Sequence, residues 1–425
     1  KMQFSDIDGT AATILGSLVD VPDGPSDAPD ADAPFELPVR ERVVVPLAGG
    51  HLLPGPNGEP ARDADQLLVA NSNEMVLVDL TATDADSAKR WTFPMAASQG
   101  VFAADGTLVV AASDEVVVGI DRQTGEELWR HASDDGLAAT ALSPTYVAVL
   151  SDDRLTVLGA RTGRKKIARD LEAPGAALQF AGDSLLVYSV ADRWLECLDL
   201  TNKAKTSHRW EAQEHLGFVA IDGRRIAVQV DGDITGVKLA NPTTPLWTRS
   251  VPAKTKPRLL ASDGGNVVLG YTGPSSSRLE VLNGDTGKGI WRVETLPYRD
   301  APTWAVAAML SGDRLALLCA TSADADADVE SQDASLAYFD LTEGRCLWQN
   351  DAMPGKVSGQ RVMGPISAGG YLLIAGEGGK LAAVSQDTGL WESELLSEDI
   401  TAPFIVDGTI VVVPQAEGIA IYESR

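Results

Sequence analysis

The sequence predicts an all-β protein that forms a single β-propeller of four-stranded blades. Three observations support this fold. Short apolar segments with an alternating pattern repeat along most of the chain, a turn of fixed spacing follows every second segment, and most repeats end on a tryptophan. The repeats start about 40 residues apart, which is the length of a four-stranded blade. Such repeats bury both faces of each sheet against neighbours, and tryptophans between the sheets favour a closed ring over an open solenoid.

Residues 107–129 form the clearest repeat. Leu108 and Val110 fall on one face of a first strand, and alternate residues of 116–120 fall on one face of a second. Ser113-Asp114 supplies the tight turn between the two strands. A second turn and a third apolar segment, which contains the tryptophan, complete the unit.

The second turn carries a motif at fixed spacing. Asp121, Thr124, Gly125 and Trp129 stand at offsets 0, +3, +4 and +8. An Asp or Asn side chain accepts hydrogen bonds from nearby backbone amides, glycine supplies a left-handed backbone, and tryptophan covers a neighbouring sheet. We interpret these as structural residues of the blades. The motif recurs, with some substitutions, at Asn283, Thr286, Gly287, Trp291, Asp340, Gly344, Trp348, Thr388, Gly389 and Trp391.

The repeats amount to nine hairpins, of which eight have an outer strand of their own. The last hairpin, formed by residues 409–413 and 418–422, lacks one. Residues 42–46 are a strand candidate that would supply it and thereby join the two ends of the propeller. That closure gives nine blades, whereas eight is the commoner number for this repeat type, so we expect about eight blades.

Three cysteines, Cys197, Cys319 and Cys346, fall in apolar segments that read as strands, and we expect buried thiols. Cys319 and Cys346 fall on the second and fourth strands of one unit. Those strands lie about 10 Å apart, whereas a disulfide needs Cα atoms within about 7 Å. We therefore expect no bond between them.

The chain divides into an acidic tail or linker, residues 1–40, and the propeller, residues 41–425. Residues 21–38 are rich in Pro, Asp and Ala, without Lys or Arg, which indicates an extended segment. No apolar run is long enough to span a membrane, and the first residues lack the pattern of a signal peptide. We expect an extracytoplasmic protein, on the cell surface or secreted, that is tethered by an upstream segment absent from this chain.

The net charge of −25 excludes several kinds of partner. Affinity for nucleic acid depends on Lys and Arg contacts with phosphates, and anionic lipid attracts basic segments. We therefore expect no nucleic acid and no membrane insertion of this chain. The remaining expectation is a monomer that binds a protein or another cell-envelope component.

The repeat resembles the quinoprotein-type propeller repeat, found in pyrroloquinoline quinone (PQQ) dehydrogenases and in many proteins that bind no quinone. The likeness extends from Gln66 to Tyr422 and is carried by GIDRQTGEELW (119–129), VLNGDTGKGIW (281–291), YFDLTEGRCLW (338–348) and AVSQDTG (383–389). The dehydrogenases stack PQQ on a disulfide between adjacent cysteines and use calcium with an Asp base. This chain has no adjacent cysteine pair, so the resemblance implies the non-enzymatic, BamB-like branch of cell-envelope scaffolds.

One residue is a candidate for a channel pocket. Trp304 precedes residues 305–308, a predicted innermost strand, and a tryptophan there would stack a ligand over the central channel, with ordinary packing as the alternative. Asp324, Asp326 and Asp328 alternate as in a calcium loop, but the glycine and the closing glutamate of an EF-hand are missing. No catalytic, cofactor-binding or metal-binding residue is assigned, and neither PQQ nor calcium is expected.

The leading hypothesis is a non-catalytic, extracytoplasmic propeller scaffold that binds a protein or cell-envelope component. Two alternatives stay open: a PQQ-dependent oxidoreductase with an atypical site, and a sensor that binds a small ligand in the propeller channel. Addition of PQQ and calcium separates the first alternative from a scaffold. A ligand that raises the melting temperature identifies the second.

Overall fold

The structure is a computed structural model of the chain. It describes residues 39–423 except 56–59, 64, 105, 133–135, 152–153, 172–176, 183, 190, 203–204, 223, 251–255, 263–264, 273–276, 294–302, 322–332, 351–365, 369, 376–380, 397–404, 408–409 and 416. Most of the predicted tail, residues 1–38, and the Asp324 insert lie outside this description.

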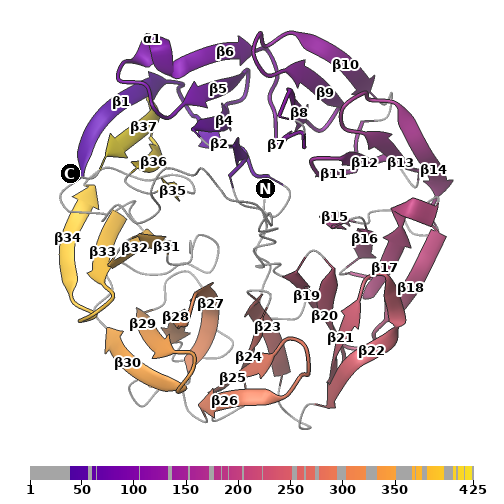
Figure 1. Cartoon of the computed structure of the whole chain (residues 1–425), viewed down its shortest axis with the longest axis vertical. Coiled ribbons are helices and arrows are strands. Elements are labelled where there is room, and N and C mark those ends of the chain that lie inside the picture. The colour runs from indigo at the N-terminus through magenta and orange to yellow at the C-terminus, as the bar shows by residue number, and fades with distance from the viewer. Residues whose placement is uncertain are drawn as a thin grey trace.

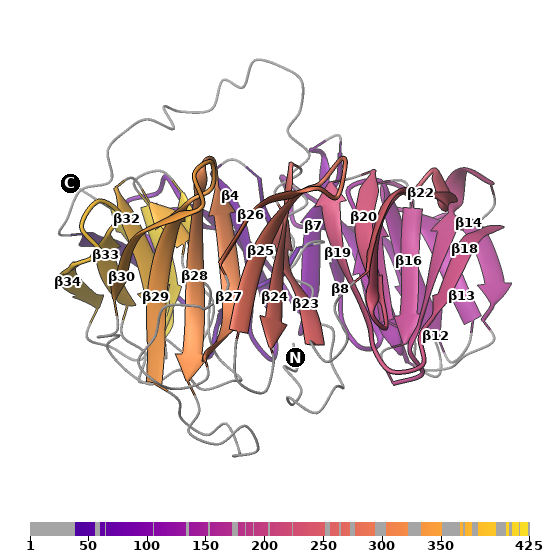
Figure 2. The ribbon, with the colours of Figure 1, turned by 90° about the horizontal axis from the view of Figure 1, so that it is seen from below.

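The described residues form nine antiparallel sheets that follow one another around a closed ring (Figure 1). Each sheet is one blade, with its first strand near the centre and its last strand at the rim. Figure 2 shows the ring from the side, with the strands running across its thickness. The predicted β-propeller is therefore confirmed.

The first two blades contain both the chain closure and the one α-helix among the described residues. Blade 1 joins β35 (Ile405–Asp407), β36 (Ile410–Pro414) and β37 (Gly418–Glu423) to β1 (Arg40–Pro46). Blade 2 contains β2 (His51–Leu52), β4 (Gln66–Ala70), β5 (Met75–Asp79) and β6 (Lys89–Phe93), with β3 (Arg62–Asp63) beside β4 and α1 (Ala85–Ala88) before β6.

The next four blades each have four strands in chain order. Blade 3 contains β7 (Gln99–Phe102), β8 (Leu108–Ala112), β9 (Val116–Asp121) and β10 (Glu127–Ala132). Blade 4 contains β11 (Ala139–Leu142), β12 (Tyr146–Ser151), β13 (Arg154–Gly159) and β14 (Lys165–Asp170). Blade 5 contains β15 (Ala177–Ala181), β16 (Ser184–Ser189), β17 (Trp194–Asp199) and β18 (Lys205–Glu211), with a 3-10 turn at Leu200–Asn202. Blade 6 contains β19 (Leu216–Asp222), β20 (Arg225–Val230), β21 (Asp233–Lys238) and β22 (Asn241–Ser250).

The last three blades follow the same plan. Blade 7 contains β23 (Lys256–Ser262), β24 (Asn266–Thr272), β25 (Ser277–Asn283) and β26 (Gly289–Val293). Blade 8 contains β27 (Thr303–Ser311), β28 (Arg314–Thr321), β29 (Asp333–Asp340) and β30 (Arg345–Asn350). Blade 9 contains β31 (Ile366–Ala368), β32 (Tyr371–Ala375), β33 (Leu381–Ser385) and β34 (Trp391–Leu396).

The ring closes as the sequence predicts, through the N-terminal strand. β1 pairs antiparallel with β37, with Val43 opposite Ile421 and Val45 opposite Ile419. The nine sheets of the described chain match the nine hairpins counted in the sequence, one more than the eight blades we expected. The difference arises because β1 completes the last hairpin as a blade of its own.

The hydrophobic core lies between the blades. On β4, Leu67 and Val69 contact the apolar cluster shared with blade 1, whereas Leu68 and Ala70 belong to the cluster shared with blade 3. Successive residues of a strand point to opposite faces, so each central strand is apolar on both sides. This explains why the inner strands read as near-continuous apolar runs.

The cysteines lie on the predicted strands but differ in exposure. Cys319 is on β28 and Cys346 on β30, the second and fourth strands of blade 8 as predicted, and Cys346 is a free thiol. Cys197 is buried as expected. The expectation was wrong for Cys346, which is exposed because it lies on the outer strand at the rim of its blade. Within the described ranges, no helix is long and apolar enough to cross a membrane.

Candidate functional site

The predicted turn motif forms closed turns at one edge of the blades. The Asp121 carboxylate accepts hydrogen bonds from the backbone N–H groups of Thr124 at 2.8 Å and Gln123 at 2.9 Å. These bonds hold the pKa of Asp121 below its ordinary value, first through the Thr124 amide. Asn283 and Asp340 make the same pair of bonds in blades 7 and 8. The turns that follow the first and third strands of an antiparallel sheet lie at the same edge of the sheet. The turns of every blade at this edge therefore lie on one face of the ring, which we call the motif face.

The glycine of the motif receives the tryptophan of the preceding blade. Gly125 has φ +74°, and a Cβ there would lie 2.8 Å from Cγ of Trp91 in blade 2. The Trp91 indole N–H donates to the Arg122 carbonyl at 2.8 Å. Glycine is therefore required both by the left-handed backbone and by the aromatic ring that packs on it.

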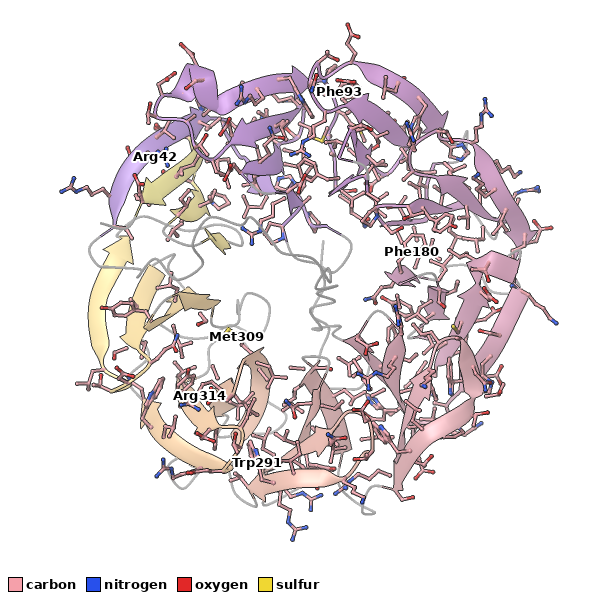
Figure 3. The ribbon with its side chains drawn as sticks, in the orientation of Figure 1. Arg42, Phe93, Phe180, Trp291, Met309 and Arg314 are labelled. Atoms are coloured by element: carbon pink, nitrogen blue, oxygen red, sulfur yellow. The ribbon has the colours of Figure 1, made fainter. Side chains whose placement is uncertain are left out.

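The same contact joins later blades, as Figure 3 shows for Trp291 at the junction of blades 7 and 8. The motif residues therefore connect neighbouring blades. The further indole N–H bonds are Trp247 to Gly284 O at 2.8 Å, Trp291 to Leu341 O at 2.6 Å and Trp348 to Gln386 O at 2.6 Å, and the rings pack on Gly287, Gly344 and Gly389.

The remaining motif residues complete or modify this pattern. The Thr124 and Thr286 hydroxyls each accept a backbone N–H two residues further on, and Thr388 does the same for Leu390 at 3.2 Å. Trp129 packs on Gly163, but its indole N–H has no hydrogen-bond partner within the described chain. Trp391 begins β34, and its side chain lies outside the described residues.

The candidate channel residue lies on the strand that the sequence predicts. Trp304 belongs to β27, the innermost strand of blade 8, where its backbone pairs with Ala320 of β28. Its side chain is outside the described residues, so the channel pocket stays a prediction. Among the residues that the structure covers, no group of three or more His, Cys, Asp or Glu side chains is arranged to hold a metal ion.

A polar pocket of about 560 Å³ lies on the motif face between blades 8 and 9. Three of its lining residues are joined by hydrogen bonds: the buried Tyr338 hydroxyl donates to Gln386 Oε1 at 2.9 Å, and the Gln386 amide donates to Ser367 Oγ at 2.9 Å. Burial raises the pKa of Tyr338, which stays a hydrogen-bond donor at neutral pH. The lining comprises Asp313, Arg314, Tyr338, Leu347, Ser367, Gln386 and Asp387.

The charged groups of this pocket are only partly paired. Arg314, labelled in Figure 3, donates to Asp340 Oδ2 at 2.9 Å and pairs with Asp313 at 2.8 Å. Asp340 thus uses one carboxylate oxygen for its turn and the other for Arg314. Asp387 is exposed at the mouth, and no described residue forms a hydrogen bond or ion pair with its side chain.

A row of exposed aliphatic side chains follows the rim of blades 6 to 8. Leu246, Ile290 and Leu347 each stand directly before the inter-blade tryptophan of their blade. We call these three residues the aliphatic arc. Each falls where the pairing of the outer strand shifts by one residue, and such a bulge turns a side chain outward. In blade 9 this bulge falls at Glu392, and the exposed Leu390 lies before the outer strand. Figure 1 shows the outer strands of the arc, β22, β26 and β30, in succession along one side of the ring.

The equivalent position differs elsewhere in the ring. Blades 2 and 4 carry Arg90 and Lys166 at the bulge, both exposed, blade 3 carries Leu128, and blade 5 carries Ser207. This structural position is therefore aliphatic in three consecutive blades, 6 to 8, and of mixed chemistry in blades 2 to 5. We missed this difference in the sequence, although the signal was present as an aliphatic residue before tryptophan in successive repeats.

Comparisons with known proteins agree with this architecture. The family model described as "Outer membrane protein assembly factor BamB" matches residues 49–131, 78–291 and 332–425. No curated protein matches the chain.

Several solved structures are similar to the chain in shape. BamB from Moraxella catarrhalis is 18% identical over 76% of this chain and 93% of its own, with a TM-score of 0.49. Sqt1 from Saccharomyces cerevisiae is 12% identical over 92% and 99%, with a TM-score of 0.47. The quinohemoprotein alcohol dehydrogenase ADHIIG from Pseudomonas putida HK5 is 12% identical over 75% and 73%, with a TM-score of 0.45. Similarities at this level say nothing about function.

Proposed function

The chain belongs to the family of outer membrane protein assembly factor BamB, and from this membership we propose that it is a non-catalytic scaffold of the cell envelope that binds a protein partner. The proposal includes an extracytoplasmic location, a monomeric chain and no cofactor. The description of the family names a protein assembly factor, which supports a role in binding other proteins.

The aliphatic arc is the observation that carries the proposal. Single exposed aliphatic side chains are ordinary on a protein surface. Here they recur at one structural position in three consecutive blades, with 43% of Ile290 and 36% of Leu347 exposed. Protein interfaces have an apolar centre depleted of charge, whereas blades 2 and 4 place basic residues at this position. The arc therefore marks the side of the ring best suited to a protein partner.

The recurring motif residues support the same division of roles. Their carboxylate, amide and indole groups are used in turns and in contacts between blades. The residues that vary between blades are left to provide a binding surface, as is usual when one fold serves many functions.

Site-specific photo-crosslinking in the native cells tests the proposal. A photoreactive phenylalanine analogue replaces Ile290 or Leu347 in the arc. Substitution of Arg90 or Lys166, at the equivalent position of blades 2 and 4, serves as the matched control. We expect protein adducts from the first two positions and few from the controls. Equal yields at all four positions, or no adduct at any, would contradict the proposal.

A second measurement tests the absence of a cofactor. The purified chain is mixed with PQQ, calcium and a dye acceptor in the presence of candidate alcohols and sugars. We expect neither saturable quinone binding nor dye reduction. Turnover would instead show that the chain is an oxidoreductase with an atypical site.

A further inference from the structure

The pocket between blades 8 and 9 stands beside the aliphatic arc, because Leu347 belongs to both. We propose that this pocket receives a lysine or arginine side chain of the protein partner, whose charge pairs with Asp387. The inference rests on the proposed function and adds the chemistry by which the partner is recognised.

At the junction between blades 6 and 7, the position that corresponds to this pocket is occupied by an arginine side chain. Arg225, the first residue of β20, pairs with Asp222 of the turn before it at 2.6 Å. It also reaches across to Asp285, the second residue after Asn283 in the turn motif of blade 7. A guanidinium therefore bridges two blades at this junction.

The junction between blades 8 and 9 has the same residue types but not the bridge. Arg314 is the first residue of β28, as Arg225 is of β20, and Asp387 is the second residue after Ser385, as Asp285 is after Asn283. Among the described residues, Arg314 pairs only within its own blade, with Asp313 and Asp340. Asp387 of the next blade thus keeps no cation from the described chain.

Strand register explains the difference between the two junctions. The residue directly opposite Arg225 is Lys238, whereas the residue opposite Arg314 is Asp340. Like charges opposite each other repel, so Arg225 is directed toward the next blade, while Asp340 attracts Arg314 and keeps it within its own sheet. Because Arg314 does not reach across to blade 9, the space that a bridging guanidinium would occupy is left as a pocket.

The lining of the pocket suits a basic side chain. Arg314 is the one cation among the described lining residues, and Asp313 and Asp340 already pair with it, so the added charge of Asp387 favours a cation and disfavours an anion. Leu347, which is 36% exposed, offers an apolar surface to the aliphatic stem of lysine or arginine. Gln386 and Ser367 supply neutral polar groups beneath the charge. The net charge of −25 also favours the approach of a basic partner.

Small probes test the pocket without knowledge of the partner. N-acetyl-arginine amide and its uncharged isostere N-acetyl-citrulline amide are titrated into the full chain, with binding followed by ligand-observed NMR. We expect the arginine probe to bind measurably more tightly than the citrulline probe. Asp387→Asn should weaken binding of the arginine probe by about two- to fivefold, the range for loss of an exposed ion pair. Asp285→Asn, whose aspartate already has an internal partner, should leave the binding unchanged.

The two proposals fail in different ways. Equal binding of both probes, or equal binding by the wild type and Asp387→Asn, would overturn the pocket assignment. The crosslinking experiment at Ile290 is then repeated in the Asp387→Asn background, where we expect the adduct yield to fall. An undiminished yield would also reject the pocket and leave the scaffold standing, whereas no adduct even with Asp387 present would reject the scaffold itself. Because Asp387 is exposed, an unchanged melting curve of the variant shows that its fold is intact.

Discussion

Removal of the guanidinium of Arg249 should destabilise the junction between blades 6 and 7. The Glu280 carboxylate on β25 is only 3% exposed and accepts a hydrogen bond from Arg249 on β22 of the preceding blade. It also accepts the Tyr271 hydroxyl at 2.9 Å, and Arg278 lies 3.8 Å away. In Arg249→Met, the carboxylate would stay buried and lose its closest cation.

The size of the effect follows from this geometry. Breaking a buried ion pair by removing one partner costs about 3–5 kcal/mol. Arg249 is 30% exposed and Arg278 remains near Glu280, so we expect a cost just below that range, about 2–3 kcal/mol. Replacing both Arg249 and Glu280 by methionine should recover most of that loss, since no unpaired charge is then buried.

Urea unfolding followed by tryptophan fluorescence measures the change in the free energy of unfolding. The matched control is Arg154→Met, because Arg154 pairs with Asp170 at 3.7 Å with both side chains exposed, and it should cost at most about 1 kcal/mol. The reasoning is refuted if Arg249→Met costs no more than this control, or if the double variant is no more stable than the single one.

Three further changes test other features of the ring. Gly125→Ala should cost more free energy of unfolding than Gly49→Ala, because both glycines have positive φ but only Gly125 packs against a tryptophan ring; equal costs in urea unfolding would contradict the packing role. Val45→Asp should destabilise the closure more than Val44→Asp, since Val45 is buried and Val44 only half-buried; the melting temperatures of the two variants decide this. Burial opposes ionisation of Asp231, but hydrogen bonds from three backbone N–H groups hold its pKa below the ordinary value, so the stability that it contributes is present above the unfolded pKa and is lost as the pH falls through the folded pKa. The difference in unfolding free energy between wild type and Asp231→Asn should therefore shrink in acid. A difference that does not depend on pH would contradict this.

The sequence was sufficient for those parts of the fold that depend on local chemistry. The spacing of Asp121, Gly125 and Trp129 predicted a turn followed by a packing tryptophan, and both occur. The apolar residues of β1 predicted the closure, because the last hairpin lacked one strand.

The candidate site depended on information that no single segment contains. Whether an arginine stays in its own blade depends on the residue opposite it, Lys238 or Asp340, and that register follows from bulges and turn lengths across a whole sheet. The exposure of Leu347 likewise depends on a bulge that apolar periodicity does not reveal. The position of Trp304 on an innermost strand was predictable, whereas its role in a pocket stays a prediction.

Closure of the ring by β1 also has a consequence for synthesis. Val43 and its partner Ile421 are about 380 residues apart in sequence, so β1 leaves the ribosome long before the strand with which it pairs. At a synthesis rate of about 5–20 residues per second, β1 would wait tens of seconds with an unpaired edge. An unpaired apolar strand is a ready site for aggregation or for exchange with a second copy. Pairing of β1 with β37, the step that completes the native ring, therefore competes with aggregation and with exchange between copies. A chaperone that holds the unpaired β1 would be of most use to this chain before β37 is synthesised.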